Sequence, residues 1–194
     1  MATGGNELEN AMKRYIDTPG ENRGQGRDKL VALLRTESVD TKYDLLMNVR
    51  GNSSGLTGIH EAARANDLGI IKNMLDGFPP NKKYDVLKIQ SCNDRTPLHF
   101  AAYWGHCSII TYLMTNLSQQ QKYDIHMMRD RHGDTPLHLA ATNEGVKAFH
   151  SIIASVPCHM LLDLLNVKNY QGKSAADIRP EINDEFPVSI VQGK

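Results

Sequence analysis

The 194-residue sequence has no surplus of charge of either sign and no long apolar run. Lys and Arg together number 22, as do Asp and Glu, so the chain lacks the concentrated positive surface that neutralises nucleic-acid phosphates. No apolar run approaches the roughly 20 residues that span a bilayer, and the N-terminal residues lack the charged and apolar stretches of a secretion signal. We therefore expect an intracellular protein, cytoplasmic or nuclear, that neither binds nucleic acid nor inserts into membranes.

Cysteine is scarce. The three cysteines, Cys92, Cys107 and Cys158, form no Cys-x-x-Cys pair. An odd count without paired spacing fits a reducing compartment. We predict three free thiols.

Patterns that carry catalysis are also lacking. Adjacent His106 and Cys107 could suggest a nucleophile with its base, but Cys107 occupies the position of Leu68 and Val146 in sister segments, which favours a small buried apolar side chain. There is no catalytic triad, no pair of carboxylates in a shared apolar pocket and no phosphate-binding glycine loop. We predict a protein that is not an enzyme, with no catalytic residue, metal or cofactor.

What the sequence does contain is one segment that returns at a constant step. Thr57-Gly-Ile-His-Glu-Ala-Ala, Thr96-Pro-Leu-His-Phe-Ala-Ala and Thr135-Pro-Leu-His-Leu-Ala-Ala start 39 residues apart, and a shorter copy starts at Ser174. Self-similarity at such a period is typical of a stacked solenoid, in which no single unit buries its own apolar face. Function must then be sought on the surface of the stack.

The copy at residues 91–129 predicts a helix, a turn and a second helix. Thr96 is suited to cap a helix that begins at Pro97, where the missing N–H costs nothing, and Gly105 is suited to end it in a left-handed turn. From about Ser108, apolar residues recur at intervals of three to four, so the second helix is amphipathic and packs on the first.

This pattern resembles the ankyrin repeat, whose Thr-Pro-Leu-His-x-Ala signature stands intact at Thr96 and Thr135. The resemblance covers roughly residues 30–180. It implies an all-α solenoid of stacked helix-turn-helix units, with β-turn fingers and a concave groove lined by the first helices. Departures include Gly58 where Pro is expected and Asp94 in place of a turn glycine.

The period exceeds that of the usual ankyrin unit, about 33 residues, by six. The additional residues follow the second helix and carry a recurring Lys-Tyr-Asp motif, at Lys42, Lys83 and Lys122. Apolar pairs spaced by three predict one or two further helical turns. The motif is open to two interpretations, as a modification or docking site or as scaffold, and its recurrence with the fold period favours scaffold.

One histidine per repeat follows each capping threonine. We expect each ring to tie its own turn to a neighbour's backbone, because metal ligands must converge on one ion and these rings are a repeat's width apart. The residues with this predicted structural role are Thr57, His60, Thr96, His99, Thr135 and His138.

The ends predict a capped array. Residues 6–16 form a possible helix, and the N-terminal part resembles a repeat that kept its second helix only. We divide the chain into a degenerate N-terminal capping repeat with a flexible N-terminus (1–51), three ankyrin repeats (52–90, 91–129 and 130–168) and a C-terminal half-repeat with its tail (169–194).

Some positions differ between the repeat copies while the signature residues stay the same, so the fold does not require a particular side chain there. The resemblance to ankyrin repeats implies that these variable positions contact a partner. The predicted partner-binding residues are Arg64, Arg95, Tyr103, Trp104, Arg131, His132, Asn143 and Tyr170. Trp104, the only tryptophan, either contacts a partner or covers the neighbouring first helix. Trp, Tyr and Arg dominate binding hot spots, which favours contact.

The hypothesis is a monomeric protein-interaction module, an adaptor or scaffold that binds a protein partner through the groove and finger tips and that could be a segment of a larger protein. An alternative is a regulatory inhibitor that occludes an enzyme or transcription factor. A third is an enzyme whose site the sequence does not reveal.

Overall fold

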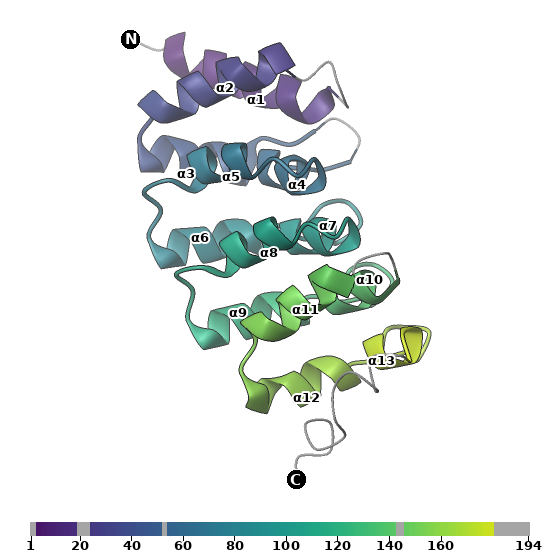
Figure 1. Cartoon of the computed structure of the whole chain (residues 1–194). Helices are drawn as coiled ribbons and strands as arrows, with labels where there is room; N and C mark the ends of the chain where they lie inside the picture. Colours follow the sequence, from purple (N-terminus) through teal and green to yellow (C-terminus); the bar gives the residue numbers. More distant parts are fainter. Residues whose placement is uncertain (1–2, 19–23, 52–53, 143–145, 181–194) are drawn as a thin grey trace.

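The protein is a stack of α-helices (Figure 1). The structure, a computed structural model, describes residues 3–18, 24–51, 54–142 and 146–180, and this part of the chain contains helices and turns without a β-strand. The helices are α1 (Thr3–Asp17), α2 (Gly24–Thr36), α3 (Val39–Asn48), α4 (Gly58–Arg64), α5 (Leu68–Leu75), α6 (Pro80–Leu87), α7 (Pro97–Tyr103), α8 (Cys107–Met114), α9 (Gln119–Met127), α10 (Pro136–Thr142), α11 (Val146–Ser155), α12 (Cys158–Asn166) and α13 (Ala175–Ile178).

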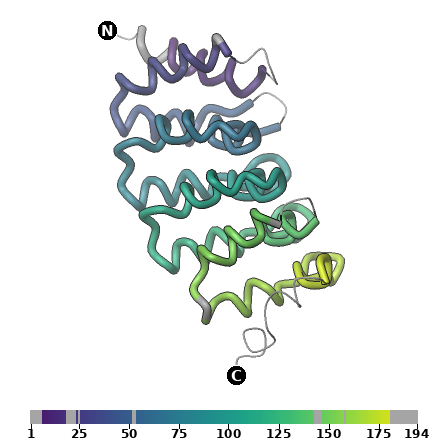
Figure 2. Tube along the Cα trace, viewed as in Figure 1, coloured from purple at the N-terminus to yellow at the C-terminus, as the bar shows by residue number. Residues whose placement is uncertain are grey.

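The helices recur in threes, and each kind forms a column along the stack (Figures 1 and 2). First helices α1, α4, α7, α10 and α13 pack on one another in that order, and second helices pair as α2 with α5 and α8 with α11. Third helices pair as α3 with α6 and α9 with α12, on the side away from the turns that precede α7 and α10. The all-α solenoid predicted from the repeats is confirmed.

Helix α7 begins as its sequence predicts. Thr96 adopts an extended conformation and its hydroxyl accepts a bond from the His99 N–H, while the His99 ring accepts one from the Thr96 N–H. This reciprocal cap satisfies two of the backbone donors that a helix start leaves unpaired. At the other end Gly105, like Asn66 after α4, has a positive φ, 72° and 58° respectively, so both helices end in the expected left-handed turn.

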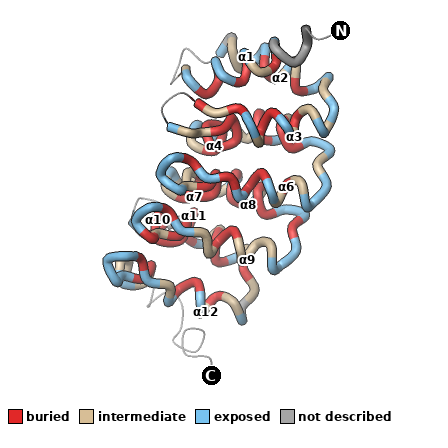
Figure 3. Tube along the Cα trace, turned by 180° about the vertical axis from the view of Figure 1, so that it is seen from behind, coloured by how far each residue is buried: buried red, intermediate tan, exposed pale blue. Residues whose placement is uncertain are grey.

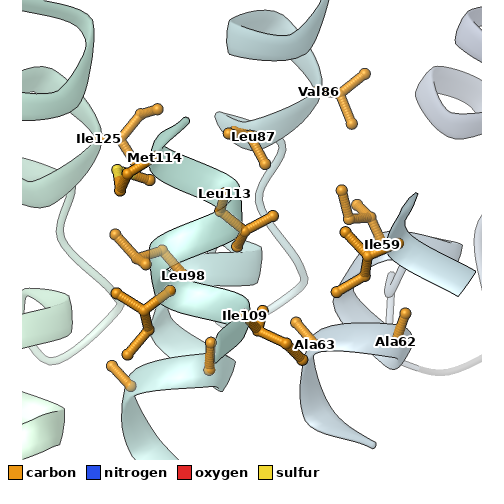
Figure 4. Close-up of a cluster of buried hydrophobic side chains, with 14 of the residues drawn as sticks. Ile59, Ala62, Ala63, Val86, Leu87, Leu98, Ile109, Leu113, Met114 and Ile125 are labelled. Atoms are coloured by element: carbon orange, nitrogen blue, oxygen red, sulfur yellow. The ribbon is translucent and has the colours of Figure 1, made fainter. Parts of the chain in front are cut away.

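Apolar side chains fill the space between successive layers. Ile59 and Ala63 of α4, Leu98 of α7, and Ile109 and Leu113 of α8 are almost fully buried and belong to one cluster of apolar side chains (Figure 4). Burying a side chain of this size stabilises the fold by about 1.5–3 kcal/mol. Buried segments face neighbouring layers, whereas the turns before α7 and α10 are largely exposed (Figure 3), so variable positions accumulate on the turns.

The N-terminal unit is more complete than the sequence predicted. The helix expected over residues 6–16 is present as α1, and it packs on α2 and α4 in the place of a first helix. The prediction that this unit kept only its second helix is therefore wrong. It failed because α1 lacks the Thr-Pro-Leu-His signature, although Leu8, Met12 and Tyr15, buried on one face at helical spacing, supply the apolar stripe.

Gly58, which replaces the proline of the sister repeats, is explained by α1. A Cβ atom at Gly58 would overlap the side chain of Met12 and would lie 2.9 Å from the methyl group of Met74. The glycine therefore allows α1 to approach the start of α4. Residues 1–2 and 19–23, part of the segment expected to be flexible, lie outside the described residues.

The Lys-Tyr-Asp segments form the third helices and link successive units. Tyr43 donates to Asp85 at 3.4 Å. Tyr84 donates to Asp124 at 2.9 Å, and Tyr123 donates to Asp163 at 3.4 Å. We call this series of bonds the tyrosine ladder. Each bond joins the third helix of one unit to that of the next.

The lysines of the first two motifs point inward. The Lys83 ammonium donates to the carbonyls of Tyr112 and Thr115 at 2.9 and 2.8 Å, at the end of α8. Lys42 donates to the carbonyl of Asp76 at 2.9 Å, at the end of α5. A cation at a helix C-terminus satisfies carbonyls that have no partner within the helix, so these contacts give the motif a structural role.

Candidate functional site

The fingers, the turns that precede the first helices, are joined into a continuous row. The backbone N–H of Cys92 donates to the carbonyl of Ser54, that of Arg131 to Asn93, and that of Tyr170 to His132, at 3.0 to 3.1 Å. Each finger is thereby fixed relative to the preceding one. Side chains on the fingers consequently hold constant positions along the stack.

Asp130 organises the third finger from inside. One carboxylate oxygen accepts the N–H groups of His132 and Asp134 at 2.8 and 3.1 Å. The other oxygen accepts the Nε–H of Arg95 at 3.0 Å, and the Asp130 side chain is fully buried. A buried carboxylate with all of these partners fixes both the turn and the arginine of the preceding finger.

Asn169 plays the corresponding part in the last finger. Its side-chain oxygen accepts the N–H groups of Gln171 and Lys173, both at 3.0 Å. Its amide nitrogen donates to a carboxylate oxygen of Asp134 at 2.7 Å. Asp134 immediately precedes Thr135 as Arg95 precedes Thr96, so the two fingers use the same geometry with donor and acceptor exchanged.

Arg95 continues from its ion pair into an aromatic pair at the end of α7. Its guanidinium carbon lies 5.7 Å from the centre of the Tyr103 ring, within the range of a cation–π contact. The Tyr103 and Trp104 rings meet edge to face with their centres 5.2 Å apart. We call these three residues the Arg95–Trp104 cluster. Three of the predicted contact residues are thus brought together.

Half of the Trp104 surface is open to solvent, at 52% exposure, and Tyr170 on the last finger is 72% exposed. They are the exposed large apolar side chains within the described residues. An aromatic ring held by a neighbouring ring and left half open loses little rotational freedom when a partner covers it. The exposure of Trp104 therefore favours contact with a partner over a role as a cover for the neighbouring helix.

The other predicted contact residues are dispersed. Arg131 donates to the ring of His132 on its own finger at 3.0 Å. It also donates to the Asn93 side chain at 2.8 Å, and this bond places the third finger beside the second. Arg64 makes two bonds of 2.8 Å to the buried carboxylate of Glu61, and this pairing holds its guanidinium against α4. Asn143 lies outside the described residues.

The periodic histidines tie turn to turn, as expected. The His99 Nδ1 atom accepts from the Thr96 N–H at 3.1 Å, so in the neutral ring the proton is on Nε2, which donates to the Asp134 carbonyl at 3.1 Å. His60 and His138 make corresponding bonds to the next finger. Burial lowers the pKa of His60 to about 3 and that of His99 to about 4, so both rings are neutral at physiological pH.

His106 and Cys107 do not form a nucleophile and base. The His106 ring bonds the carbonyl of Arg64 at 3.3 Å, and the Cys107 thiol donates to the carbonyl of Gly105 at 3.4 Å. Cys107 is half-buried rather than buried, and both it and exposed Cys92 are free thiols; the Cys158 side chain lies outside the description.

Within the described residues, no three His, Cys, Asp or Glu side chains are grouped as metal ligands.

Two of the contacts that escaped the sequence analysis involve buried polar side chains, those of Asp130 and His126. The Arg95–Asp130 pair joins residues 35 positions apart, and the signal for it was the aspartate that takes the place of Ser91 in the preceding finger. His126 of α9 is fully buried and bonds the Ser155 hydroxyl at 2.7 Å. It stands outside the repeat signature, so no periodic pattern indicated it.

Comparison with known proteins agrees with this geometry. No helix of the described chain combines the length and apolar character that crossing a membrane requires. No curated protein sequence matches the chain. A family model of ankyrin repeats (3 copies) matches residues 22–124 and 59–160, which together span most of the sequence. The repeated caps, the joined fingers and this match show that the chain belongs to the ankyrin-repeat family.

Proposed function

We propose that the chain is a non-enzymatic adaptor or scaffold that binds a protein partner through its fingers and the exposed ends of its first helices. Ankyrin repeats are protein-interaction modules, which supports the general role; the site within the chain is our inference. The observation that carries it is the Arg95–Trp104 cluster, in which an exposed tryptophan is backed by a tyrosine and an ion-paired arginine.

The cluster suits partner binding because it is held in place before a partner arrives. Asp130 fixes Arg95, Arg95 lies over Tyr103, and Tyr103 supports Trp104. Preorganised side chains pay less ordering entropy on association. Trp, Tyr and Arg are also the residues that most often carry binding energy, with about 2 kcal/mol or more lost on truncation to Ala.

The remaining parts of the proposal concern the setting of the molecule. We propose a monomer that works inside the cell, without nucleic acid as a ligand. The balance of 22 basic and 22 acidic residues supports the last point. A partner that proves to be an enzyme or transcription factor inhibited by the chain would identify a regulatory inhibitor instead of an adaptor.

The test is affinity capture from a cell lysate followed by direct binding to the purified partner. The wild-type chain is compared with a Tyr103→Ala/Trp104→Ala variant whose folding is checked by circular dichroism. A Gln119→Ala/Gln120→Ala variant, which changes exposed residues of the third helix α9, is the control. We expect the control to keep the partner and the aromatic variant to weaken binding about 30-fold or more, the equivalent of 2 kcal/mol. Equal binding by all three chains would refute the site.

A further inference from the structure

We propose that the Arg95–Trp104 cluster, together with Arg131, recognises an acidic segment of the protein partner, in which an Asp or Glu stands close to an apolar side chain. This inference rests on the proposed function for the identity of the site, and it adds the chemical class of the partner. The observation behind it is a pair of arginines anchored between the second and third fingers, one of which leads to the half-exposed ring of Trp104.

The two arginines cross between these fingers in opposite directions. Arg95 of the second finger reaches Asp130 of the third through its Nε–H at 3.0 Å. Arg131 of the third finger reaches the side-chain oxygen of Asn93 on the second at 2.8 Å, and its backbone N–H bonds the Asn93 carbonyl at 3.1 Å. Both guanidinium groups are thereby fixed at one junction of the stack before a partner binds, which lowers the entropy cost of association.

Anchoring does not use all of the guanidinium donors. An arginine side chain has five N–H groups. Arg95 uses one of them for Asp130. Arg131 uses one for Asn93 and one for the ring of His132. In the described part of the chain no other group accepts from these two side chains, so both keep terminal N–H groups for an external acceptor, and a carboxylate is the acceptor that guanidinium binds most strongly.

The segments that join each third helix to the next first helix carry a surplus of positive charge. Residues 49–57, 88–96, 128–135 and 167–174 hold seven basic side chains against three acidic ones. The whole chain, by contrast, is balanced at 22 of each. A surface of net positive charge complements an acidic partner and steers its approach.

The three carboxylates of these segments do not fill the site. Asp130 is fully buried and bonded to Arg95, and Asp134 accepts the amide of Asn169 at 2.7 Å. Asp94 is exposed and has a positive φ of 59°. Asn also adopts this conformation readily, so an Asp94→Asn substitution removes the exposed negative charge and keeps the turn.

The aromatic pair supplies the apolar half of the site. The guanidinium carbon of Arg95 lies 5.7 Å from the centre of the Tyr103 ring, and that centre lies 5.2 Å from the centre of the Trp104 ring. An extended chain covers this distance with about three residues. Other repeats lack the combination, since Leu56 and Ala65 stand at the positions of Arg95 and Trp104. We therefore expect the partner to carry its acidic residue within about three positions of an apolar one.

The first experiment selects ligands without assuming their sequence. A library of random peptides displayed on phage is selected on the immobilised full chain. We expect the enriched peptides to combine Asp or Glu with an aromatic or aliphatic side chain at the spacing given above. Enrichment of neutral or basic peptides would overturn the proposal, and so would a failure to enrich any peptide over a bare surface.

One enriched peptide that lacks tryptophan is then titrated against purified chains, with the fluorescence of Trp104, the only tryptophan, as the signal. Arg131→Gln should weaken binding about tenfold, because it removes charge-assisted bonds. Asp94→Asn should strengthen binding about threefold, because it removes a like charge. The same peptide with Asn and Gln in place of its acids should bind the wild type at least about tenfold more weakly.

The matched control is Arg35→Gln. Arg35 of α2 also donates to an asparagine side chain, that of Asn73 at 3.2 Å. The substitution therefore removes the same charge and the same kind of bond as Arg131→Gln, but on a second helix and not on a finger. We expect it to leave peptide binding unchanged. Equal affinity of the acidic peptide for all of these chains would contradict the assignment of the site.

The outcomes separate this inference from the proposed function. If the Tyr103→Ala/Trp104→Ala variant loses its partner but acidic and neutral peptides bind alike, only the acidic class of partner is rejected. If acidic peptides bind and respond to Arg131→Gln and Asp94→Asn, but the aromatic variant keeps every partner, the cluster is rejected as the site of the proposed function.

Discussion

The pairing of Arg95 with Asp130 can be tested by replacing the two residues with Asp and Asn, the pair that Asp134 and Asn169 form at the next finger. An Asp130→Asn substitution keeps one oxygen for the N–H groups of His132 and Asp134, but it turns an amide N–H toward the Nε–H of Arg95. Two donors then face each other. Hydrogen bonds to charged groups are worth about 1.5–3 kcal/mol, and Arg95 retains some access to water, so we expect a loss of about 2 kcal/mol in the free energy of unfolding.

An Arg95→Asp substitution alone should cost at least as much, because it places a second carboxylate against buried Asp130. The double variant recreates the pair of Asp134 and Asn169, in which the amide donates to the carboxylate at 2.7 Å. We therefore expect the double variant to lie within about 1 kcal/mol of the wild type, the remainder reflecting the lost contact of Arg95 with Tyr103.

The assay is urea denaturation of the four chains of this double-mutant cycle, followed by circular dichroism. The expected coupling energy is about 3 kcal/mol, in the sense that the second substitution rescues the first. Losses that simply add would refute the reasoning, since they would show that the finger does not depend on matching a donor to an acceptor at these two positions.

Further predictions concern backbone strain and pH. Gly133 and Gly172 both have positive φ, 77° and 75°, but only at Gly133 would a Cβ meet the Tyr170 ring, at 2.7 Å. Gly133→Ala should thus lower the free energy of unfolding clearly more than Gly172→Ala, whose cost of about 1 kcal/mol reflects φ alone; equal thermal shifts would contradict this. Burial lowers the pKa of His99 to about 4 and that of His126 to about 3, so both stay neutral in the fold while the unfolded chain takes up protons below pH 6.5. Stability should then be fully present above pH 6.5 and fall toward pH 4, by up to about 1.4 kcal/mol per pH unit for each ring. A His126→Gln chain should show a shallower decline in chemical denaturation across that range, and an unchanged slope would show that His126 is not buried neutral.

The caps of the first helices could be predicted from sequence because their determinants are local. Thr96 and His99 are three residues apart, and a side chain at a helix start can reach only the first turn. The turn at Gly105 follows from the conformational freedom of one residue. Predictions of this kind depend on a few consecutive residues, which the sequence displays directly.

Contacts between units were less accessible. The recurrence of Lys-Tyr-Asp favoured a structural role, but the motif does not reveal that Lys83 reaches carbonyls about 30 residues further along the chain. Lys122 is followed by the same Tyr-Asp pair and is only half-buried. Partner choice depends on how far each layer is rotated relative to the next, and this geometry is absent from a short motif.

The site itself divides in the same way. Variation between copies selected Arg95, Tyr103 and Trp104, which the structure brings into contact. Variation between copies could not indicate that Arg64 is held by the buried carboxylate of Glu61. Both positions differ between the repeats, and sequence variation alone does not reveal that two variable residues pair with each other. Which of these residues bind a partner stays a prediction.

The tyrosine ladder has a consequence for how the array can change in length. Each internal third helix contributes both a donor and an acceptor: α6 supplies Tyr84 and Asp85, and α9 supplies Tyr123 and Asp124. Loss of the complete 39-residue unit that contains α9 would bring Tyr84 opposite Asp163. Each remaining ladder tyrosine would then still have an aspartate as its acceptor. Duplication of an internal unit would likewise add one bond for each unit gained. The ladder is thus a connector that is indifferent to unit number, and an array can lengthen or shorten without breaking the tyrosine–aspartate bonds between its third helices.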